Sequence, residues 1–312
     1  MALEKIVALV GGVGGAKLAH GLAQILPPEQ LTIIVNTGDD FWHHGLRICP
    51  DLDTVMYTLA GLVDPVNGWG VAGDTTAALD ALAAYGDESW FRLGDRDIAT
   101  HLLRTERLRQ GERLTTITHD LSRRLHIGSR ILPMTDAEVA TIVHTRETGP
   151  LPFQEYFVKY RWQPAVTAIR FEGAEAASLS PEAVAALNHV DAILIAPSNP
   201  WLSVAPILAV PGLRARIESA QLPRVAITPI VGGRALKGPA AKLMAELGYT
   251  VTPESVAGYY GSVINGFVYD ERDPVVDLPG LRVLRTDTIM TTDHDRARFA
   301  AQVLAWMEQT SL

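Results

Sequence analysis

The first fifty residues alternate between uninterrupted apolar runs and a segment with helical periodicity. Residues 5–10 (KIVALV) and 31–36 (LTIIVN) are almost entirely apolar, which is typical of strands covered on both faces. Between them, residues 16–26 (AKLAHGLAQIL) place apolar side chains at helical spacing. A strand, a helix and a second strand within roughly 35 residues predict a right-handed βαβ unit with parallel strands.

The same pattern returns in the second half of the chain. Further strands of the buried type are predicted at residues 165–171, 190–197 and 224–230. Helices are predicted at residues 180–189, 204–219, 238–249 and 292–309. This alternation predicts a Rossmann-like α/β fold, with a three-layer α/β/α core around a mostly parallel sheet.

The middle of the chain follows a different pattern. Four segments have helical periodicity without buried strands between them: 51–62, 74–85, 95–109 and 115–126. Two further segments, 138–145 and 153–162, are expected to form a small extra substructure. No linker rich in proline or serine separates these parts. We therefore predict a single Rossmann-like domain over residues 1–312, with a core of residues 1–50 and 163–312 and a mostly helical insertion at 51–162.

Composition narrows the class of protein. The formal net charge of −8 argues against wholesale binding to nucleic acid or to an anionic membrane. No uninterrupted apolar run approaches the roughly 18 residues that a membrane-spanning helix needs, so we expect no membrane segment. Cys49 is the single cysteine, which rules out an internal disulfide and makes a reducing cytoplasm the simplest location.

The first candidate site is the glycine loop GGVGGAK (11–17), between the first strand and the first helix. Glycines such as Gly12, Gly14 and Gly15 let backbone N–H groups approach a phosphate, and the helix N-terminus adds partial positive charge. The loop matches neither the P-loop nor the full dinucleotide-binding fingerprint. A phosphate or nucleotide contact is favoured over a tight turn without a ligand.

The second candidate is the acidic stretch VNTGDDFWHHGLRICPDLDT (35–54), which leaves the end of the second predicted strand. Asp39 stands where a dehydrogenase places its ribose-binding acid, so NAD binding is an alternative. However, one ribose needs one carboxylate, and Asp40, Asp51 and Asp53 follow. Asp51 and Asp53 are suited to capping a helix. The other interpretation is a Mg²⁺ site, since Mg²⁺ binds one or two carboxylates and completes its shell with water and phosphate oxygens. His43 and His44 could donate to a phosphate or substrate oxygen.

Three further segments carry polar side chains suited to binding. The segment GDRDIATH (94–101) gathers acids, His101 and Arg96 at a helix start, where Arg96 could hold an anionic substrate group or belong to a surface cluster. Ser198 and Asn199 follow a buried strand in APSNP (196–200), at the sheet edge where ligands bind in open α/β folds. TPIVGGRALKGP (228–239) reads as a second anion-binding loop with Gly233 and Lys237.

The chain lacks the sequence signatures of several hydrolases and redox enzymes. There is no Ser-His-Asp arrangement, no HExxH and no CxxC motif. This pattern favours a reaction carried out by positioning and charge neutralisation, such as phosphoryl transfer, which needs no protein nucleophile.

These motifs resemble those of a known family. GGVGGAK, NTGDDFWHHGLRICPDLDT, GDRDIATH, APSNPWLSVAPIL and TPIVGGRALKGPA occur in the order found in the 2-phospho-L-lactate transferase family of coenzyme F420 biosynthesis. The chain looks most like the bacterial phosphoenolpyruvyl or phospholactate transferases. The resemblance implies Mg²⁺ and transfer of one of these groups from a guanosine-diphospho donor to the deazaflavin 7,8-didemethyl-8-hydroxy-5-deazariboflavin, with release of GMP. It does not distinguish phospholactate from phosphoenolpyruvate.

The resemblance also implies roles for particular residues. Asp53, Arg96 and His44 are expected to contact the deazaflavin acceptor. Asp39 or Asp53 is expected to accept the proton of the attacking hydroxyl. The expected metal ligands are Asp39, Asp40 and Asp53. The expected donor-binding residues are Gly12, Gly14, Gly15, Ser198, Asn199, Gly233 and Lys237.

Two other functions remain open on the sequence alone. An NAD(P)-dependent oxidoreductase would bind nicotinamide tightly and need no metal. A non-enzymatic regulator of the same superfamily would bind a nucleotide without turnover, although the intact PDLDT and GDRD motifs argue against it. A homodimer is expected by analogy with the fold.

Overall fold

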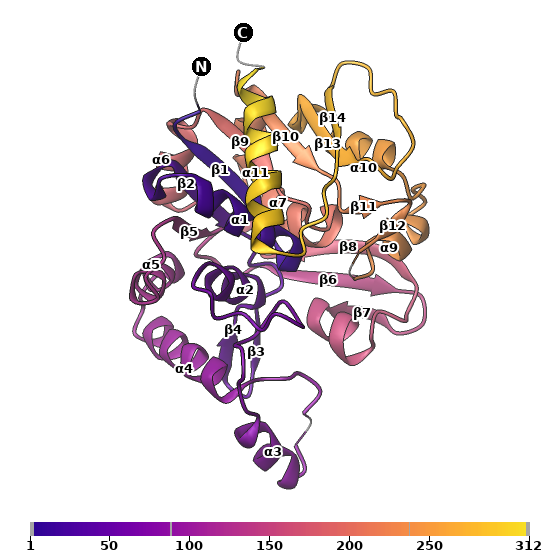
Figure 1. Cartoon of the computed structure of the whole chain (residues 1–312). Coiled ribbons are helices and arrows are strands. Elements are labelled where there is room, and N and C mark those ends of the chain that lie inside the picture. The colour runs from indigo at the N-terminus through magenta and orange to yellow at the C-terminus, as the bar shows by residue number, and fades with distance from the viewer. Residues whose placement is uncertain (1–2, 88, 237, 310–312) are drawn as a thin grey trace.

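The core of the protein is a seven-stranded sheet in which every neighbouring pair of strands is parallel (Figure 1). The computed structural model describes residues 3–87, 89–236 and 238–309. In spatial order the strands are β14 (Arg282–Thr286), β13 (Gly266–Asp270), β10 (Arg224–Ile227), β9 (Ala192–Ile195), β1 (Ile6–Val10), β2 (Leu31–Val35) and β5 (Arg130–Pro133).

Side chains of the central strands alternate between two hydrophobic clusters, one on each face of the sheet. Ile6 and Val10 pack on one face, and Val7 and Leu9 pack on the other. The first face is covered by α1 (Gly12–Ile25), α2 (Pro50–Leu59), α5 (Leu114–Arg124) and α11 (Asp293–Glu308). The second face is covered by α6 (Pro181–Asn188), α7 (Ala205–Ala209), α8 (Leu213–Ser219), α9 (Ala240–Glu246) and α10 (Pro253–Tyr260). The predicted three-layer α/β/α fold is therefore confirmed.

Three sequence-based assignments within the core differ from the structure. Residues 165–171, predicted as a buried core strand, form β8 (Val166–Glu172) in a separate antiparallel sheet, because polar residues alternate along the segment and half of it faces solvent. The predicted helix at 204–219 is two helices, α7 and α8, since Pro211 and Gly212 (φ +83°) interrupt it. The edge strands β13 and β14 were not predicted.

The range predicted as an insertion, 51–162, also contributes to the main sheet. Strand β5 lies within it and pairs with β2 in parallel, so the helices before β5 form an excursion between two neighbouring strands. That excursion contains α3 (Ala77–Ala84) and α4 (Asp95–Arg109), and α3 projects from the body of the molecule (Figure 1). Of the two segments predicted to form an extra substructure, 138–145 contains β6 (Ala140–Thr145), which joins β7 (Gly149–Pro152) and β8 in the order β7-β6-β8. The other, 153–162, is not part of this sheet and contains the π-helical turn η2 (Glu155–Lys159).

Short elements connect these layers. The hairpins are β3 (Phe41–His43) with β4 (Leu46–Ile48), and β11 (Ile230–Val231) with β12 (Arg234–Ala235). Single turns of 3₁₀-helix occur at η1 (Pro28–Gln30), η3 (Ala174–Ala176) and η5 (Gly261–Val263), and π-helical turns at η2 (Glu155–Lys159) and η4 (Pro200–Val204). Among the helices of the described residues, not one combines the length and apolarity needed to cross a bilayer.

Candidate functional site

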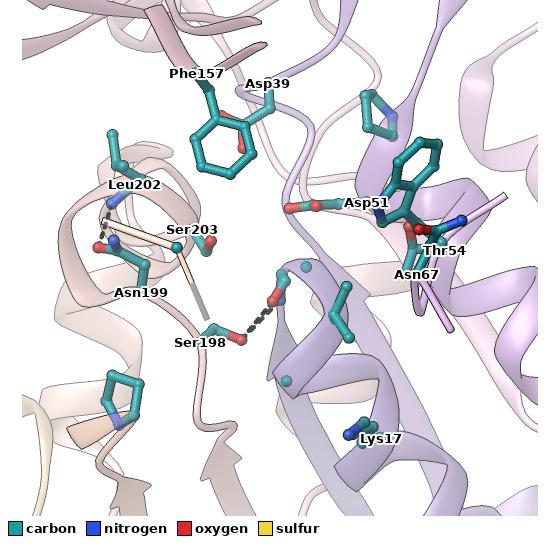
Figure 2. A pocket seen from close by; sticks show the side chains of 18 of the residues that line it. Lys17, Asp39, Asp51, Thr54, Asn67, Phe157, Ser198, Asn199, Leu202 and Ser203 are labelled. Atoms are coloured by element: carbon teal, nitrogen blue, oxygen red, sulfur yellow. Dashed lines mark hydrogen bonds between the residues drawn. The ribbon is translucent and has the colours of Figure 1, made fainter. Parts of the chain in front are cut away.

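A large cavity opens at the carboxyl ends of the central strands, where open α/β folds bind their ligands. Its volume is about 930 Å³, which exceeds the space that a single nucleotide needs. The lining comes from segments that are distant in sequence: 11–17, residue 39, 48–57, 67–70, 90–101, 153–158, 197–203, 228–231, 236, 238–240 and 288–291. The cavity therefore joins the core, the excursion between β2 and β5, and the small sheet (Figure 2).

The glycine loop and the segment after β9 form one wall of the cavity. Gly12 has a φ of +64°, which favours glycine, and a Cβ on Gly14 would lie 2.6 Å from the carbonyl oxygen of Pro197. Ser198 fastens the two loops together, since its Oγ accepts from Gly11 N (3.1 Å) and donates to Gly11 O (2.7 Å), as Figure 2 shows. The loop therefore needs glycines partly because the backbone of residues 197–198 lies so close to it. The start of α1 lines the cavity, where it could bind an anion.

Asn199 shapes the turn that follows Ser198. Its Oδ1 accepts from the backbone nitrogens of Trp201 (3.0 Å) and Leu202 (3.2 Å) and so caps η4. Gly12, Gly14, Ser198 and Asn199, all predicted to bind the donor, are brought together on this wall.

Asp39 and Asp51 form a buried carboxylate pair beside the glycine loop. Both line the cavity, and Figure 2 shows them above the start of α1. Asn36 Nδ2 donates to Asp51 Oδ2 (3.0 Å), and its Oδ1 accepts from Gly38 N (2.8 Å). Burial raises the pKa of Asp51 to about 6, opposed by hydrogen bonds from Asn36 and the Gly12 backbone. Burial and the charge of Asp51 raise the pKa of Asp39 well above its usual value.

The raised pKa of Asp51 predicts a pH-dependent effect of Asp51→Asn. The folded protein binds the Asp51 proton more tightly than the unfolded chain, so burial of the charged form costs stability that accumulates between the unfolded pKa of 3.8 and the folded pKa of about 6. In EDTA, we expect the melting temperature of Asp51→Asn to approach that of the wild type as the pH falls to about 4. At pH 7 and above it should exceed the wild type by several degrees, since two pKa units correspond to about 3 kcal/mol.

Thermal melts of both proteins between pH 4 and 8 test this difference, which cancels the contribution of titrating groups that do not interact with Asp51. A gap that is constant with pH, or one that widens toward pH 4, would contradict the assignment of a buried, charged Asp51.

Asp53 belongs to a second cluster, formed by α2 and α4. Arg104 binds both of its carboxylate oxygens, with Nη1 3.0 Å from Oδ2 and Nη2 in contact with Oδ1. His101 lies between two acids, with Nδ1 3.6 Å from Asp53 Oδ2 and Nε2 3.3 Å from Asp97 Oδ1. Tyr57 donates to Asp97 Oδ1 (2.7 Å). Burial alone would raise the pKa of Asp97, but the neighbouring His101 holds it below its usual value.

The capping interpretation of Asp51 and Asp53 is not what the structure shows. The N-cap of α2 is Cys49, and Pro50 begins the helix. The two acids lie in the first turn, where the helix dipole favours them, but their side chains are turned to Asn36 and Arg104. Both carboxylates line the cavity.

Asp40 lies behind the cavity wall rather than beside Asp39. Its side chain is buried, with Oδ2 3.9 Å from Nη2 of Arg47. Burial raises its pKa to about 7, and the guanidinium of Arg47 opposes that rise. The structure therefore brings Asp39 and Asp53 to the cavity and places Asp40 against an arginine.

The GDRD segment contributes other residues than the predicted Arg96. Arg96 is exposed, and its Nη1 donates to the Ala72 carbonyl (3.4 Å). Asp95 caps α3 by accepting from Ala77 N (3.1 Å) and Ala78 N (3.0 Å). Asp97, on the same helix α4, faces the cavity.

The two histidines after β2 sit at a hairpin. His44, predicted to contact the acceptor, has a φ of +48° and its Nδ1 lies 3.2 Å from Asp87 Oδ2. His43 packs against the Trp90 ring at a centroid distance of 5.3 Å, and burial lowers its pKa to about 4. His43 is therefore neutral at pH 7.

The remaining predicted donor residues have separate positions. Gly15 lies under the loop, where a Cβ would be 2.6 Å from Ser198 Oγ. Gly233 forms the turn between β11 and β12 with a φ of +69°, and its nitrogen donates to Asp273 Oδ1 (2.9 Å). The loop around it lines the cavity at Thr228, Pro229, Val231, Leu236 and residues 238–240. Lys237 lies outside the described residues.

Sequence reasoning missed much of the lining. Five aromatic side chains also line the cavity: Trp69, Trp90, Phe91, Phe153 and Phe157. These rings come from loops and from η2, so no strand or helix period connects them. Arg104 was missed because it reads as one of several arginines on a charged helix. Lys17 was noted only within the glycine motif, and its Nζ donates to the Met290 carbonyl (2.8 Å) at the cavity edge.

Comparison with known proteins gives consistent matches over the full length. The sequence model of the family described as 2-phospho-L-lactate transferase CofD matches residues 6–310. A Nocardia farcinica protein named phosphoenolpyruvate transferase is 39% identical, with 96% of this chain and 94% of that protein covered. A Streptomyces griseus protein of the same name is 42% identical, covering 98% and 99%.

A solved structure shares the fold. A member of the UPF0052 family from Bacillus halodurans superimposes with a TM-score of 0.66, covering 97% of this chain and 99% of that one. The sequence identity is 14%, so this likeness supports the fold alone.

Proposed function

Because the chain belongs to the 2-phospho-L-lactate transferase family, we propose that it transfers a phosphoenolpyruvyl group from a guanosine-diphospho donor to 7,8-didemethyl-8-hydroxy-5-deazariboflavin, releasing GMP. The names of the Nocardia and Streptomyces relatives favour phosphoenolpyruvate over 2-phospho-L-lactate as the transferred group. The product would be a phosphorylated precursor of coenzyme F420.

One observation carries the proposal: a buried carboxylate pair and a glycine-lined helix start share one cavity of about 930 Å³. That volume accommodates a donor and an acceptor together. The backbone of the glycine loop and the start of α1 suit a diphosphate. The aromatic wall of Trp69, Trp90 and Phe91 suits a flat tricyclic ring, which stacks on aromatic faces.

The acidic pair fits a divalent cation, and we propose Mg²⁺. Asp39 Oδ1 is buried and has no hydrogen-bond partner within the described residues. Burial raises the pKa of both Asp39 and Asp51, and the charge of Asp51 raises that of Asp39 further, so a cation at this pair would stabilise the charged carboxylates. Carboxylate oxygens are the ligands that Mg²⁺ prefers.

Asp39 and Asp51 would hold this ion. Of the metal ligands predicted from the sequence, this proposal keeps Asp39. It puts Asp51 in place of Asp40 and Asp53, because each of those two faces an arginine. When bound, Mg²⁺ supplies positive charge that offsets the diphosphate and the leaving GMP.

The residues of the chain then have distinct tasks in the transfer. The ribityl hydroxyl of the acceptor attacks the β-phosphorus, a new O–P bond forms, and the bond from that phosphorus to GMP breaks. Asp53 lines the cavity, and Arg104 holds its carboxylate in place. We propose that Asp53 accepts the proton of the attacking hydroxyl. Backbone N–H groups of the glycine loop hold the diphosphate, and the aromatic wall excludes water from the reacting atoms.

A transfer assay tests the proposal. The protein is mixed with Mg²⁺, the deazaflavin and either the phosphoenolpyruvyl or the phospholactyl donor, and products are measured by mass spectrometry. We expect GMP and phosphorylated product, faster from the phosphoenolpyruvyl donor, and at least a hundredfold loss in EDTA. Nucleotide binding without product from either donor would reject the enzyme and favour a regulator. Product that is unaffected by EDTA would reject the metal.

A further inference from the structure

The strongest unexplained feature of the cavity wall is Arg104. Its side chain is completely buried, and it lies on α4, outside the α/β core. A buried charge is unfavourable unless it is paired and hydrogen-bonded. Its guanidinium contacts both oxygens of Asp53, the Arg47 carbonyl (3.5 Å) and His101 Nδ1 (3.3 Å), and Asp53 and His101 line the cavity. Its Nε is buried without a hydrogen-bond partner among the described residues.

We propose that Arg104 is a positioning residue for the transfer reaction. It fixes the plane of the Asp53 carboxylate toward the acceptor hydroxyl and gives Asp53 a counter-charge from within the protein. Asp53 then interacts with the acceptor hydroxyl and not with the divalent cation, which binds at Asp39 and Asp51. The inference rests on the proposed function for its kinetic part.

The geometry supports a role in orientation. A guanidinium that binds a carboxylate through two nitrogens fixes its plane, whereas a lysine ammonium contacts it as a point charge. Arg104 reaches Asp53 from α4, while Asp53 lies on α2, so the bridge joins the excursion to the core at the cavity. A well-packed apolar pair would serve stability as well as a buried ion pair does. Stability alone therefore does not account for this charge.

The distribution of counter-charges separates the acids into two groups. Asp53 is bound by Arg104, and Asp40 faces Arg47. Within the described part of the chain, neither Asp39 nor Asp51 forms an ion pair. A cation that enters the cavity would therefore gain most at Asp39 and Asp51, since at Asp53 it would meet a guanidinium.

Arg104→Lys tests the positioning role by kinetics. Lysine keeps the buried positive charge but cannot bind the carboxylate through two nitrogens. We therefore expect kcat to fall about 30- to 100-fold, while the KM for the donor stays within about threefold of the wild type. Arg107→Lys is the matched control on the same helix, because Arg107 pairs with Glu112 and Asp120 away from Asp53. The control should stay within twofold of the wild type in kcat and keep its melting temperature. Arg104→Lys is expected to lower the melting temperature, because Arg104 is buried, so kcat is measured well below the melting transition of each variant.

A double mutant separates positioning from a merely structural role. If Arg104 acts through Asp53, adding Arg104→Lys to Asp53→Asn lowers kcat no further than Asp53→Asn alone. Losses that multiply, or an Arg104→Lys kcat within threefold of the wild type, would overturn the inference.

Manganese binding provides a readout that does not need turnover. Mn²⁺ is titrated without substrates and followed by electron paramagnetic resonance. We expect Asp53→Asn to leave the Mn²⁺ dissociation constant within about twofold and Asp51→Asn to weaken binding at least tenfold. Equal weakening by both variants, or no Mn²⁺ binding to the wild type, would overturn the division of the acids. If the wild type makes no product, the proposed function and the kinetic role of Arg104 fail, while this titration still decides which acids bind the cation.

Discussion

Asp53→Asn is expected to lower kcat for the transfer by about 10²- to 10⁴-fold, the range for loss of a positioned general base. The side chain keeps its size and one oxygen for Arg104, but it can no longer accept a proton. Its amide group would face a guanidinium nitrogen, so a moderate loss of stability accompanies the loss of rate. Measurement of kcat, acceptor KM and melting temperature on the same samples separates the two effects.

Asparagine is the informative substitution at this position. Asp53→Ala would leave the buried guanidinium of Arg104 without a partner, which costs about 3–5 kcal/mol and risks unfolding the protein. The matched control is Asp120→Asn on α5, where the carboxylate pairs with surface arginines and does not line the cavity. A folded Asp53→Asn variant with kcat within tenfold of the wild type would show that Asp53 does not accept the proton.

Gly14→Ala is expected to lower kcat/KM for the donor by at least about a hundredfold. The new Cβ would lie 2.6 Å from the Pro197 carbonyl oxygen, and because that atom belongs to the backbone, the two loops must separate. The displacement would move the glycine loop away from Ser198 and Asn199 and disturb the place proposed for the diphosphate. Overpacking of this kind also costs about 1–3 kcal/mol of stability. Kinetics at varied donor concentration and a thermal melt measure both effects.

Gly258→Ala is the control for this substitution. Gly258 lies in α10, where a new Cβ would meet no atom within 4 Å. Replacement of glycine by alanine inside a helix stabilises a protein by up to about 1 kcal/mol, so this variant should be fully active. If Gly14→Ala retained the wild-type donor KM and kcat, the glycine loop would not contact the donor.

The central fold was predictable because its strands have a simple sequence pattern. Residues 5–10 and 31–36 are almost entirely apolar, and they form β1 and β2 with both faces covered. The pattern was less informative at 165–171, where apolar residues alternate with polar ones and the strand joins the small antiparallel sheet. Strand β5 was missed because its four residues are too short to show a period.

Part of the candidate site was predictable, because the ends of buried strands and the glycine loops can be recognised in the sequence. Asp39, Asp53, Gly12, Gly14, Ser198 and Asn199 follow or face the carboxyl ends of strands, and they meet at one cavity. By contrast, two predicted residues contact other parts of the protein: Arg96 contacts the Ala72 carbonyl, and His44 contacts Asp87. Their neighbours in sequence suggested binding, but a helix or hairpin turns consecutive side chains to different sides.

The sequence by itself determined the α/β class, the order of the first strands and the motifs that identify the family, because these depend on local pattern and composition. Only the tertiary structure decided which of the acids pair with an arginine and which do not. It pairs Asp53 with Arg104, 51 residues away, places Asp40 against Arg47, and brings Asp39 and Asp51 to the cavity without an arginine partner among the described residues. Burial and the identity of the nearest charge determine what a carboxylate does, and both depend on contacts between distant segments.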